Sequence, residues 1–287
     1  MIRQHHPIRT AVALSAIAAA LLFAGCGGSS SSGKAGGVNT VRAAYVSSSV
    51  EGYKIGIKVT GTAAGHTINV TGSGTVAQAA HASWLTLNIS PPTVGGENLQ
   101  IDAIVLGKDF YLKVPASLAA TLPGGKPWLE LNLSEFGKTV GIQGLSSLVD
   151  NPGEGPTRIL RVLRKGSTGS VQNLGQHTID GVSTTGLRAT IDLSKVVDTL
   201  PASQQQNASS AIASIEKLTG LRYLPIDAWV DSSDHVRRMV VSEMGHVEAR
   251  PFSEKVQLDF VKYGPEPVPA APPTDEVTNI MSLSGTL

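Results

Sequence analysis

The chain contains a single cysteine, Cys26, in 287 residues. One cysteine cannot build an internal disulfide framework, so packing must hold the fold together. Charged residues make up only 16% and aromatic residues 5%, and the formal net charge is +1. No basic block follows the first few residues, so we expect no nucleic-acid partner. No apolar stretch after residue 25 approaches the roughly 18 residues of a membrane span.

Motifs for catalysis and metal binding are also missing. Ser214 and Lys217 have S-x-x-K spacing, but the partner motifs of penicillin-recognising enzymes are absent. Residues 181–186 miss the G-x-S-x-G nucleophile turn by one position. The histidines beyond residue 6 lie on separate segments without zinc-site spacing; they are His66, His81, His177, His235 and His246. We therefore expect no catalytic residue, no metal and no cofactor.

The first 25 residues have the organisation of an export signal. Arg3 and Arg9 stand in a short charged head, and an apolar run follows at positions 11–24. Such a head, a run of about 7 to 15 apolar residues and small residues before a cut are typical of a secretory signal. The segment ends Leu22-Phe23-Ala24-Gly25-Cys26, which resembles the bacterial lipoprotein box, with Phe23 where leucine is commonest. Residues 1–25 are therefore predicted to be a lipoprotein signal peptide.

Cys26 is the predicted site of lipid attachment, because a thiol at the cut can carry a diacylglyceryl group. The alternative is that Cys26 is only a small residue near an ordinary cut. One acyl chain binds a membrane marginally, at about 0.8 kcal/mol per buried CH2, whereas two or three chains hold durably. Residues 26–37 would form a flexible tether of glycine and serine. We thus expect the protein on the extracytoplasmic side of the plasma membrane, anchored through Cys26.

Residues 38–287 are predicted to form one α+β domain dominated by strands. At 53–60, apolar Tyr53, Ile55, Ile57 and Val59 alternate with glycine and polar residues, which indicates a strand with one apolar face. Similar segments separated by turn residues predict an antiparallel meander. They lie at 66–76, 83–89, 99–106, 110–114, 128–133, 169–179, 184–193, 226–230, 236–242 and 256–261. The proline-rich segment 265–273 is expected at a sheet edge or across the surface.

Helical spacing appears at 39–49, 145–166 and 202–219. In the last of these, Ser203 and Gln206 form a predicted capping box, and Gly220 ends the helix. The second carries a basic face that is either solvated or in contact with anionic lipid head groups. This face comprises Arg158, Arg161, Arg164 and Lys165.

A weak repeat links two parts of the chain. Residues 131–134 read Leu-Asn-Leu-Ser, and residues 191–194 read Ile-Asp-Leu-Ser. Each closes an alternating strand and is expected to open a short helix with its serine as cap. We infer that the domain has two halves of similar plan.

Several motifs, taken in order, resemble the LppX/LprG-type lipoproteins of actinobacteria. They are the box at Cys26, Trp128-Leu129-Glu130-Leu131, residues 180–182 with the strand 187–193, the hairpin 225–231 with 236–239, and residues 259–264 followed by Pro272-Pro273. The resemblance implies a strongly curved antiparallel sheet of about 10–11 strands, a half-barrel related to the carriers LolA and LolB, with helices on its concave face. It also implies a cavity for a long-chain lipid or lipoglycan. The glycine-rich turns and the proline cluster depart from the family, so ligand size does not transfer.

The inward-facing strand residues are the candidates for a ligand cavity. Judged from the residues alone, the same face could equally form an ordinary packed core, and the resemblance favours the cavity. The predicted lining residues are Ile55, Ile57, Val59, Leu85, Leu87, Ile89, Val105, Leu112 and Val114. A one-residue error in the predicted parity of a strand would place its lining residues on the outer face of the sheet.

We therefore expect a non-enzymatic carrier that binds a lipid or lipoglycan and moves it from the plasma membrane toward the cell envelope. Its partners would be that ligand, the membrane reached through Cys26 and a membrane transporter. The alternative is an interaction or accessory module with a solid core, which docks a transporter or a cell-wall component. A hydrolase built on Ser214 is the third and least favoured reading.

Overall fold

The computed structural model describes residues 52–63, 66–90, 98–122, 124–139, 142, 155–247 and 250–283. Within these residues the strands form one sheet of 12 strands. They are β1 (Gly52–Ala63), β2 (His66–Ala77), β3 (Ala82–Ser90), β4 (Leu99–Leu106), β5 (Asp109–Lys113), β6 (Trp128–Asn132), β7 (Gln172–Ile179), β8 (Val182–Asp192), β9 (Tyr223–Asp231), β10 (Val236–Val247), β11 (Arg250–Tyr263) and β12 (Val277–Asn279).

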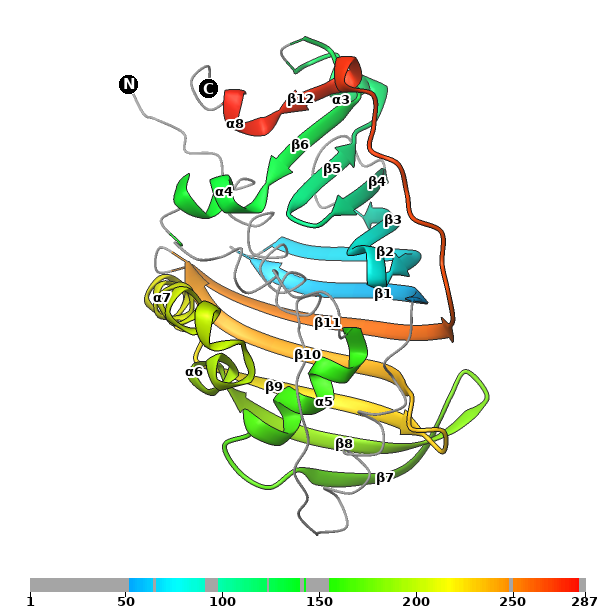
Figure 1. The fold of residues 1–287 in the computed structure, drawn as a ribbon, viewed down its shortest axis with the longest axis vertical. Coiled ribbons are helices and arrows are strands. Elements are labelled where there is room, and N and C mark those ends of the chain that lie inside the picture. Colours follow the sequence, from blue (N-terminus) through cyan, green and yellow to red (C-terminus); the bar gives the residue numbers. More distant parts are fainter. Residues whose placement is uncertain are drawn as a thin grey trace.

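The sheet is built from two antiparallel meanders. Its strand order is β12-β6-β5-β4-β3-β2-β1-β11-β10-β9-β8-β7. The first meander comprises β1 to β6, the second comprises β7 to β11, and the two meet where β1 pairs with β11. The pair of β12 with β6 is parallel. Figure 1 shows the strong curvature of the sheet and the helices against one face, which confirms the predicted fold class. The sheet has 12 strands instead of 10–11 because the segment after the prolines adds the short edge strand β12.

The helices cover the two meanders unequally. Helices α5 (Gly155–Lys165) and α6 (Leu193–Val196) pack on β8, and α7 (Ala202–Thr219) packs on β10. Helices α4 (Leu133–Thr139) and α8 (Ile280–Leu283) lie against β6 (Figure 1). Short turns complete the described elements: α3 (Ala116–Ala119), η1 (Gln78–Ala80), η3 (Val197–Thr199) and η4 (Thr274–Glu276).

The main core lies between α5, α7 and the second meander. Leu160 and Leu163 of α5 are 0% exposed, and Ile212 and Ile215 of α7 are at most 3% exposed. They belong to one apolar cluster with the strand residues beneath them. Each such side chain contributes about 1.5–3 kcal/mol relative to its exposed state, which fixes these helices on β8 to β11.

The end of α7 follows the prediction, but its start does not. Gly220 adopts φ 71° and donates its backbone N–H to Glu216, so the glycine cap is confirmed. The capping box of Ser203 and Gln206 is wrong, because Pro201 occupies the N-cap without a side-chain hydrogen bond. With Pro201 as the N-cap the helix starts two residues earlier than a Ser203 cap would place it, so Ser203 falls inside its first turn.

The repeated segments both turn from a strand into a short helix, but serine is not the cap. Asn132 Oδ1 accepts from the backbone N–H of Ser134 at 3.0 Å, and Asp192 Oδ1 accepts from that of Ser194 at 3.0 Å. Asn and Asp side chains reach the amide two residues ahead, so they cap before the serines can. The prediction of serine caps is therefore wrong.

Several predicted features lie outside the described residues. These are the signal peptide, Cys26 with its tether, the helix at 39–49 and the first part of the helix at 145–166. The segment 265–273 has no regular structure and carries the chain from β11, in the middle of the sheet, to the edge next to β6, where β12 forms (Figure 1). In the part of the chain that the structure describes, no helix has the length and apolar character needed to cross a membrane.

Candidate functional site

The predicted lining residues share one face of the sheet. Across the strands, Ile55 pairs with Gly74, Gly74 with Leu85, and Leu85 with Ala103. Directly paired residues of antiparallel strands point to the same side. By this register eight of the nine predicted residues lie together, and they are Ile55, Ile57, Val59, Leu85, Leu87, Ile89, Val105 and Leu112. Val114 lies just past the end of β5 and is 6% exposed, outside the main cluster.

Burial along this face changes from one half of the sheet to the other. One row of paired residues runs through Leu187, Ala228, Met239 and Leu258, all at most 3% exposed. The same row continues into the first meander with residues that are only half-buried, namely Ile57, Leu87 and Ile101. The neighbouring row repeats the change, from fully buried Val256 to half-buried Val59 and Ile89.

The unequal cover follows from the positions of the helices. Because α5, α6 and α7 pack on β8 and β10, they bury the apolar face of the second meander. On β1 to β5 the same apolar pattern continues with less cover on the two rows just described, whereas the row of Ile55, Leu85 and Ala103 stays buried. Removing apolar surface from water is favourable by about 25 cal/mol per Å², so this half of the face can gain free energy from an additional apolar partner.

Two glycines of β2 shape that half of the face. A Cβ atom on Gly74 would lie 2.1 Å from the backbone O of Trp84 and 2.7 Å from Cδ2 of Leu85. On Gly72 it would lie 2.7 Å from Cδ2 of Leu87. The leucines of β3 therefore lean over β2, into space that only glycine leaves free.

A pair of carboxyl groups lies on the same face. Glu243 of β10 is directly opposite Glu254 of β11, and Glu254 is opposite Gly61 of β1. Glu243 is 5% exposed, and Oε1 of Glu254 is buried with no hydrogen-bond partner among the described residues. Burial, followed by repulsion from Glu254, raises the pKa of Glu243 to about 8. Burial also raises the pKa of Glu254. Glu243 therefore holds a proton at neutral pH and can donate a hydrogen bond in an otherwise apolar setting.

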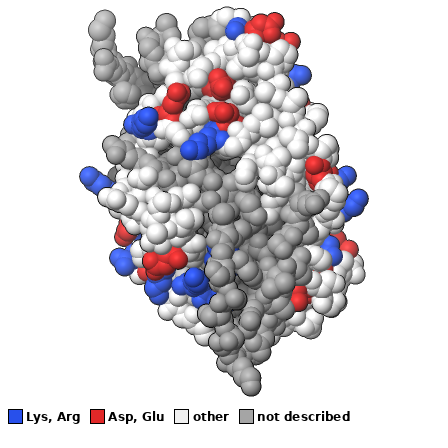
Figure 2. All heavy atoms as spheres, in the orientation of Figure 1, with Lys and Arg blue, Asp and Glu red and all other residues white. Residues whose placement is uncertain are grey.

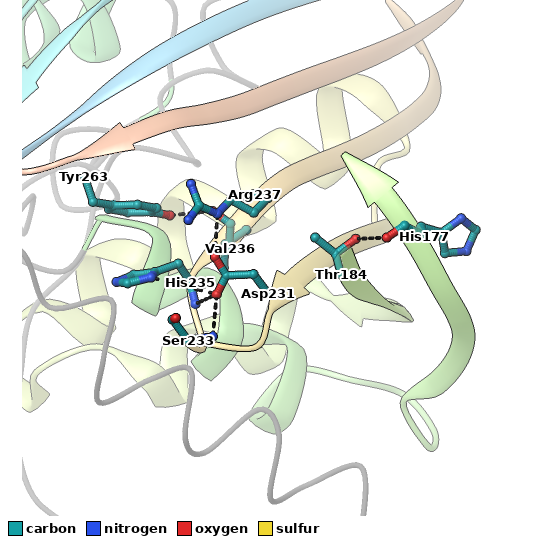
Figure 3. Close-up of polar contacts among 8 residues, drawn as sticks. All are labelled: His177, Thr184, Asp231, Ser233, His235, Val236, Arg237 and Tyr263. Carbon is teal, nitrogen blue, oxygen red and sulfur yellow. Dashed lines mark hydrogen bonds and ion pairs between the residues drawn. The ribbon is translucent and has the colours of Figure 1, made fainter. Parts of the chain in front are cut away.

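A polar cluster around Asp231 lies at the end of the second meander opposite to the glutamate pair (Figure 3). Oδ1 of Asp231 accepts from the backbone N–H groups of Ser233 at 2.8 Å and His235 at 3.0 Å, and Oδ2 accepts from Nε of Arg237 at 2.5 Å. Burial alone would raise the pKa of Asp231, but these hydrogen bonds outweigh it and hold the pKa below its usual range. The side chain of Tyr263 stacks on His235 and donates to the backbone O of Val236. This cluster fixes the β9–β10 turn.

The contacts of the cluster favour a structural role. The carboxylate of Asp231 accepts from the β9–β10 turn and from Arg237 at the start of β10, and the hydroxyl of the neighbouring Thr184 donates to the backbone O of His177. The serine of the S-x-x-K motif is also engaged locally, since Ser214 donates to the backbone O of Ser210 at 2.9 Å. Among the described residues, no three His, Cys, Asp or Glu side chains gather as metal ligands would.

Sequence reasoning missed the carboxyl pair, although a signal for it existed. The alternation that identifies Val256, Leu258 and Phe260 as inward residues continues backward through Glu254 to Phe252. Extending the period would have placed a charged residue on the apolar face. The predicted strands 236–242 and 256–261 stop short of Glu243 and Glu254, whereas β10 and β11 contain both residues.

The resemblance indicated by the motifs is also found among solved structures. The lipoprotein LppX of Mycobacterium tuberculosis aligns with 82% of this chain and 97% of its own, at 17% identity and a TM-score of 0.45. LprF of Mycobacterium bovis aligns with 81% of this chain and 95% of its own, at 16% identity and a TM-score of 0.43. A DUF1329 family protein from Desulfovibrio piger covers 78% of this chain at 9% identity, with a TM-score of 0.27. No protein-family model and no curated protein matches the chain.

Proposed function

We propose that this protein is a lipid-binding lipoprotein without enzymatic activity. In this proposal Cys26 carries the membrane anchor on the outer side of the plasma membrane, and residues 26–37 tether the domain formed by the rest of the chain. The domain binds the acyl chains of a lipid or lipoglycan against the sheet and carries it toward the cell envelope. The motif resemblance to the LppX/LprG-type lipoproteins points in the same direction.

The observation that carries the proposal is the change in burial along one continuous apolar face. Along two rows of this face, residues are buried under α5 to α7 but only half-buried on the first meander, where Ile57, Leu87 and Ile101 lie. An acyl chain laid there would be removed from water at about 0.8 kcal/mol per CH2, or about 12 kcal/mol for some 16 carbons before ordering costs. The nine predicted lining residues remain the proposed contact set.

The test is mass spectrometry of organic extracts from protein purified without detergent. We expect a long-chain lipid in about equimolar amount with the protein. Ile57→Asn places an amide on the apolar face and should lower the lipid content several-fold. The matched control is Lys58→Asn, because Lys58 is exposed and adjacent on β1 but points to the other face. It should keep the parental lipid content.

Two outcomes would contradict the proposal. One is an extract that contains no lipid, which would favour an accessory module with a solid core. The other is equal lipid content in the Ile57→Asn and Lys58→Asn proteins, which would locate the lipid away from this face.

A further inference from the structure

Exposed apolar side chains gather at one end of the second meander, where α7 leads into β9. Leu218 is 46% exposed, Tyr223 49% and Met244 78%. The turn after α7 lies against the end of β10, because a Cβ on Gly220 would meet the His246 ring at 2.7 Å. A single exposed apolar residue needs no explanation, but three at one end of a sheet indicate a contact surface.

Basic side chains surround these apolar residues. The backbone N–H of Asp192 at the end of β8 donates to the backbone O of Gly166, which brings the end of α5 to the same end of the sheet. The exposed cations of this end are Arg164, Lys165, Lys195, Lys217, Arg222 and Arg250. The described acidic side chains beside them are Asp192, which is buried and caps α6, the exposed Asp198, and Glu216 at 3.7 Å from Arg222. Glu243, next to Met244, is also buried, and Glu254 lies opposite it with Oε1 buried. In Figure 2, Lys and Arg spheres lie at the lower left around a smaller group of Asp and Glu spheres, where Figure 1 places α6 and the end of α5.

The arrangement of Tyr223 adds a chemical preference. The guanidinium carbon of Arg222 lies 5.4 Å from the centre of the Tyr223 ring, so an aromatic ring and a cation project together. Tyrosine prefers the boundary between lipid head groups and acyl chains, and each Lys or Arg near an anionic bilayer adds about 1 kcal/mol of attraction. A surface with apolar side chains in its centre and cations around them matches the anionic surface of a membrane.

We propose that this end of the sheet, formed by Leu218, Arg222, Tyr223, Met244 and Arg250 with the nearby lysines, docks on an anionic lipid surface. We call it the membrane-docking end. Of the basic face of α5, for which lipid contact is one of the two readings, Arg164 and Lys165 lie at this end, whereas Arg161 donates to the backbone O of Thr199. Docking requires neither a lipid on the apolar face nor an acyl chain on Cys26, so it stands apart from the proposed carrier function.

The test uses the full chain carrying Cys26→Ser, which has no acyl chain and no other cysteine. One cysteine is then introduced by Met244→Cys and labelled with a fluorophore that reports local polarity. The control is Ser232→Cys, at an exposed site in the turn at the opposite end of β9. Because both proteins retain residues 1–25, any adsorption through that segment affects them equally.

We expect the Met244 label to shift to the blue with vesicles of phosphatidylcholine and phosphatidylglycerol, but not with phosphatidylcholine alone. The Ser232 label should not respond. Lys217→Glu combined with Arg250→Glu should weaken the vesicle affinity by about tenfold or more, because two attractive charges become repulsive. The charge-matched control is Lys54→Glu with Lys58→Glu, exposed on β1, which should leave the affinity nearly unchanged.

Three results would overturn the proposal. Equal responses of the two labels would show that this end is not the contact. A response to phosphatidylcholine alone would remove the role of the cations. A shift that grows with protein concentration without vesicles would assign the surface to a second copy of the chain. Lipid content after purification is measured separately, so the carrier proposal can fail or succeed on its own.

Discussion

Glu243 and Glu254 place two carboxyl groups opposite each other on a face that is otherwise mostly apolar. A charged glutamate loses its hydration there, so the folded state favours the protonated form of Glu243. Because the two groups interact, their protons belong to the pair and titrate as a coupled unit. The pair therefore links the stability of the fold to pH.

We predict that Glu243→Gln stabilises the protein at alkaline pH. The pKa of Glu243 rises from 4.5 to about 8 on folding, so the parent loses stability as the pH climbs through this window. The neutral amide carries no such penalty. The gain of the variant over the parent should therefore grow across the window and reach on the order of 4 kcal/mol near pH 9.

Urea unfolding of both proteins at several pH values between these limits measures the gain. Glu216→Gln is the control, since Glu216 lies near the surface at the end of α7. Parallel pH profiles for the parent and Glu243→Gln would contradict the predicted linkage. A constant offset would reflect only the packing of the new amide.

At the scale of single elements, the glycines of β2 decide how closely β3 can pack. We predict that Gly74→Ala destabilises the protein by about 1–3 kcal/mol, as overpacked sites usually do. The added Cβ would lie 2.1 Å from the backbone O of Trp84 and 2.9 Å from Cα of Leu85, so a backbone has to move. Gly169→Ala is the matched control, because nothing lies within 4 Å of its Cβ and its φ is not positive. Thermal melts of both variants should separate them clearly, and equal melting temperatures would contradict the packing of β3 on β2.

The elements that the sequence predicted well are those set by local alternation. Ile226, Ala228 and Val230 are at most 5% exposed, as period-two spacing indicates. Errors arise where a longer-range contact decides. β12 has three residues and exists because it pairs with β6, a contact that no local pattern reveals. The cap positions differ for a local reason instead, because Pro201 occupies the N-cap of α7 ahead of Ser203 and Asn132 accepts from the backbone N–H of Ser134.

For the candidate site, sequence reasoning could predict which face is apolar but not how much of it is covered. Parity along β1 and β3 places Ile57 and Leu87 on the same side, and the register agrees. Their half-buried state depends on where α5 to α7 pack, which is a property of the whole sheet. The membrane-docking end was hidden for the same reason, since Leu218 and Met244 are far apart in sequence.

At the scale of the whole molecule, the two meanders should respond differently to the proposed ligand. We predict that removing bound lipid accelerates amide hydrogen exchange in β3 to β5 by about tenfold or more, while β8 to β10 change little. The second group is already covered by helices, with Ala228 and Met239 at 0% exposed. Exchange mass spectrometry of lipid-bound and delipidated protein gives the comparison. Uniform acceleration across both meanders would contradict a ligand confined to the first.

The junction of the two meanders has a consequence for how the chain acquires its shape. β1 and β11 are the first and the last long strands of the described chain, yet Tyr53 pairs with Tyr263 in the middle of the sheet. A polypeptide threaded N-terminus first through a narrow pore cannot close this seam until Tyr263 has emerged, and such distant closures are slow. Until then one edge of each strand remains unpaired and can pair with a strand of another chain. If the protein is exported, as proposed, the chain would therefore emerge unfolded, and β1 could pair with β11 only after nearly all of the strands had emerged.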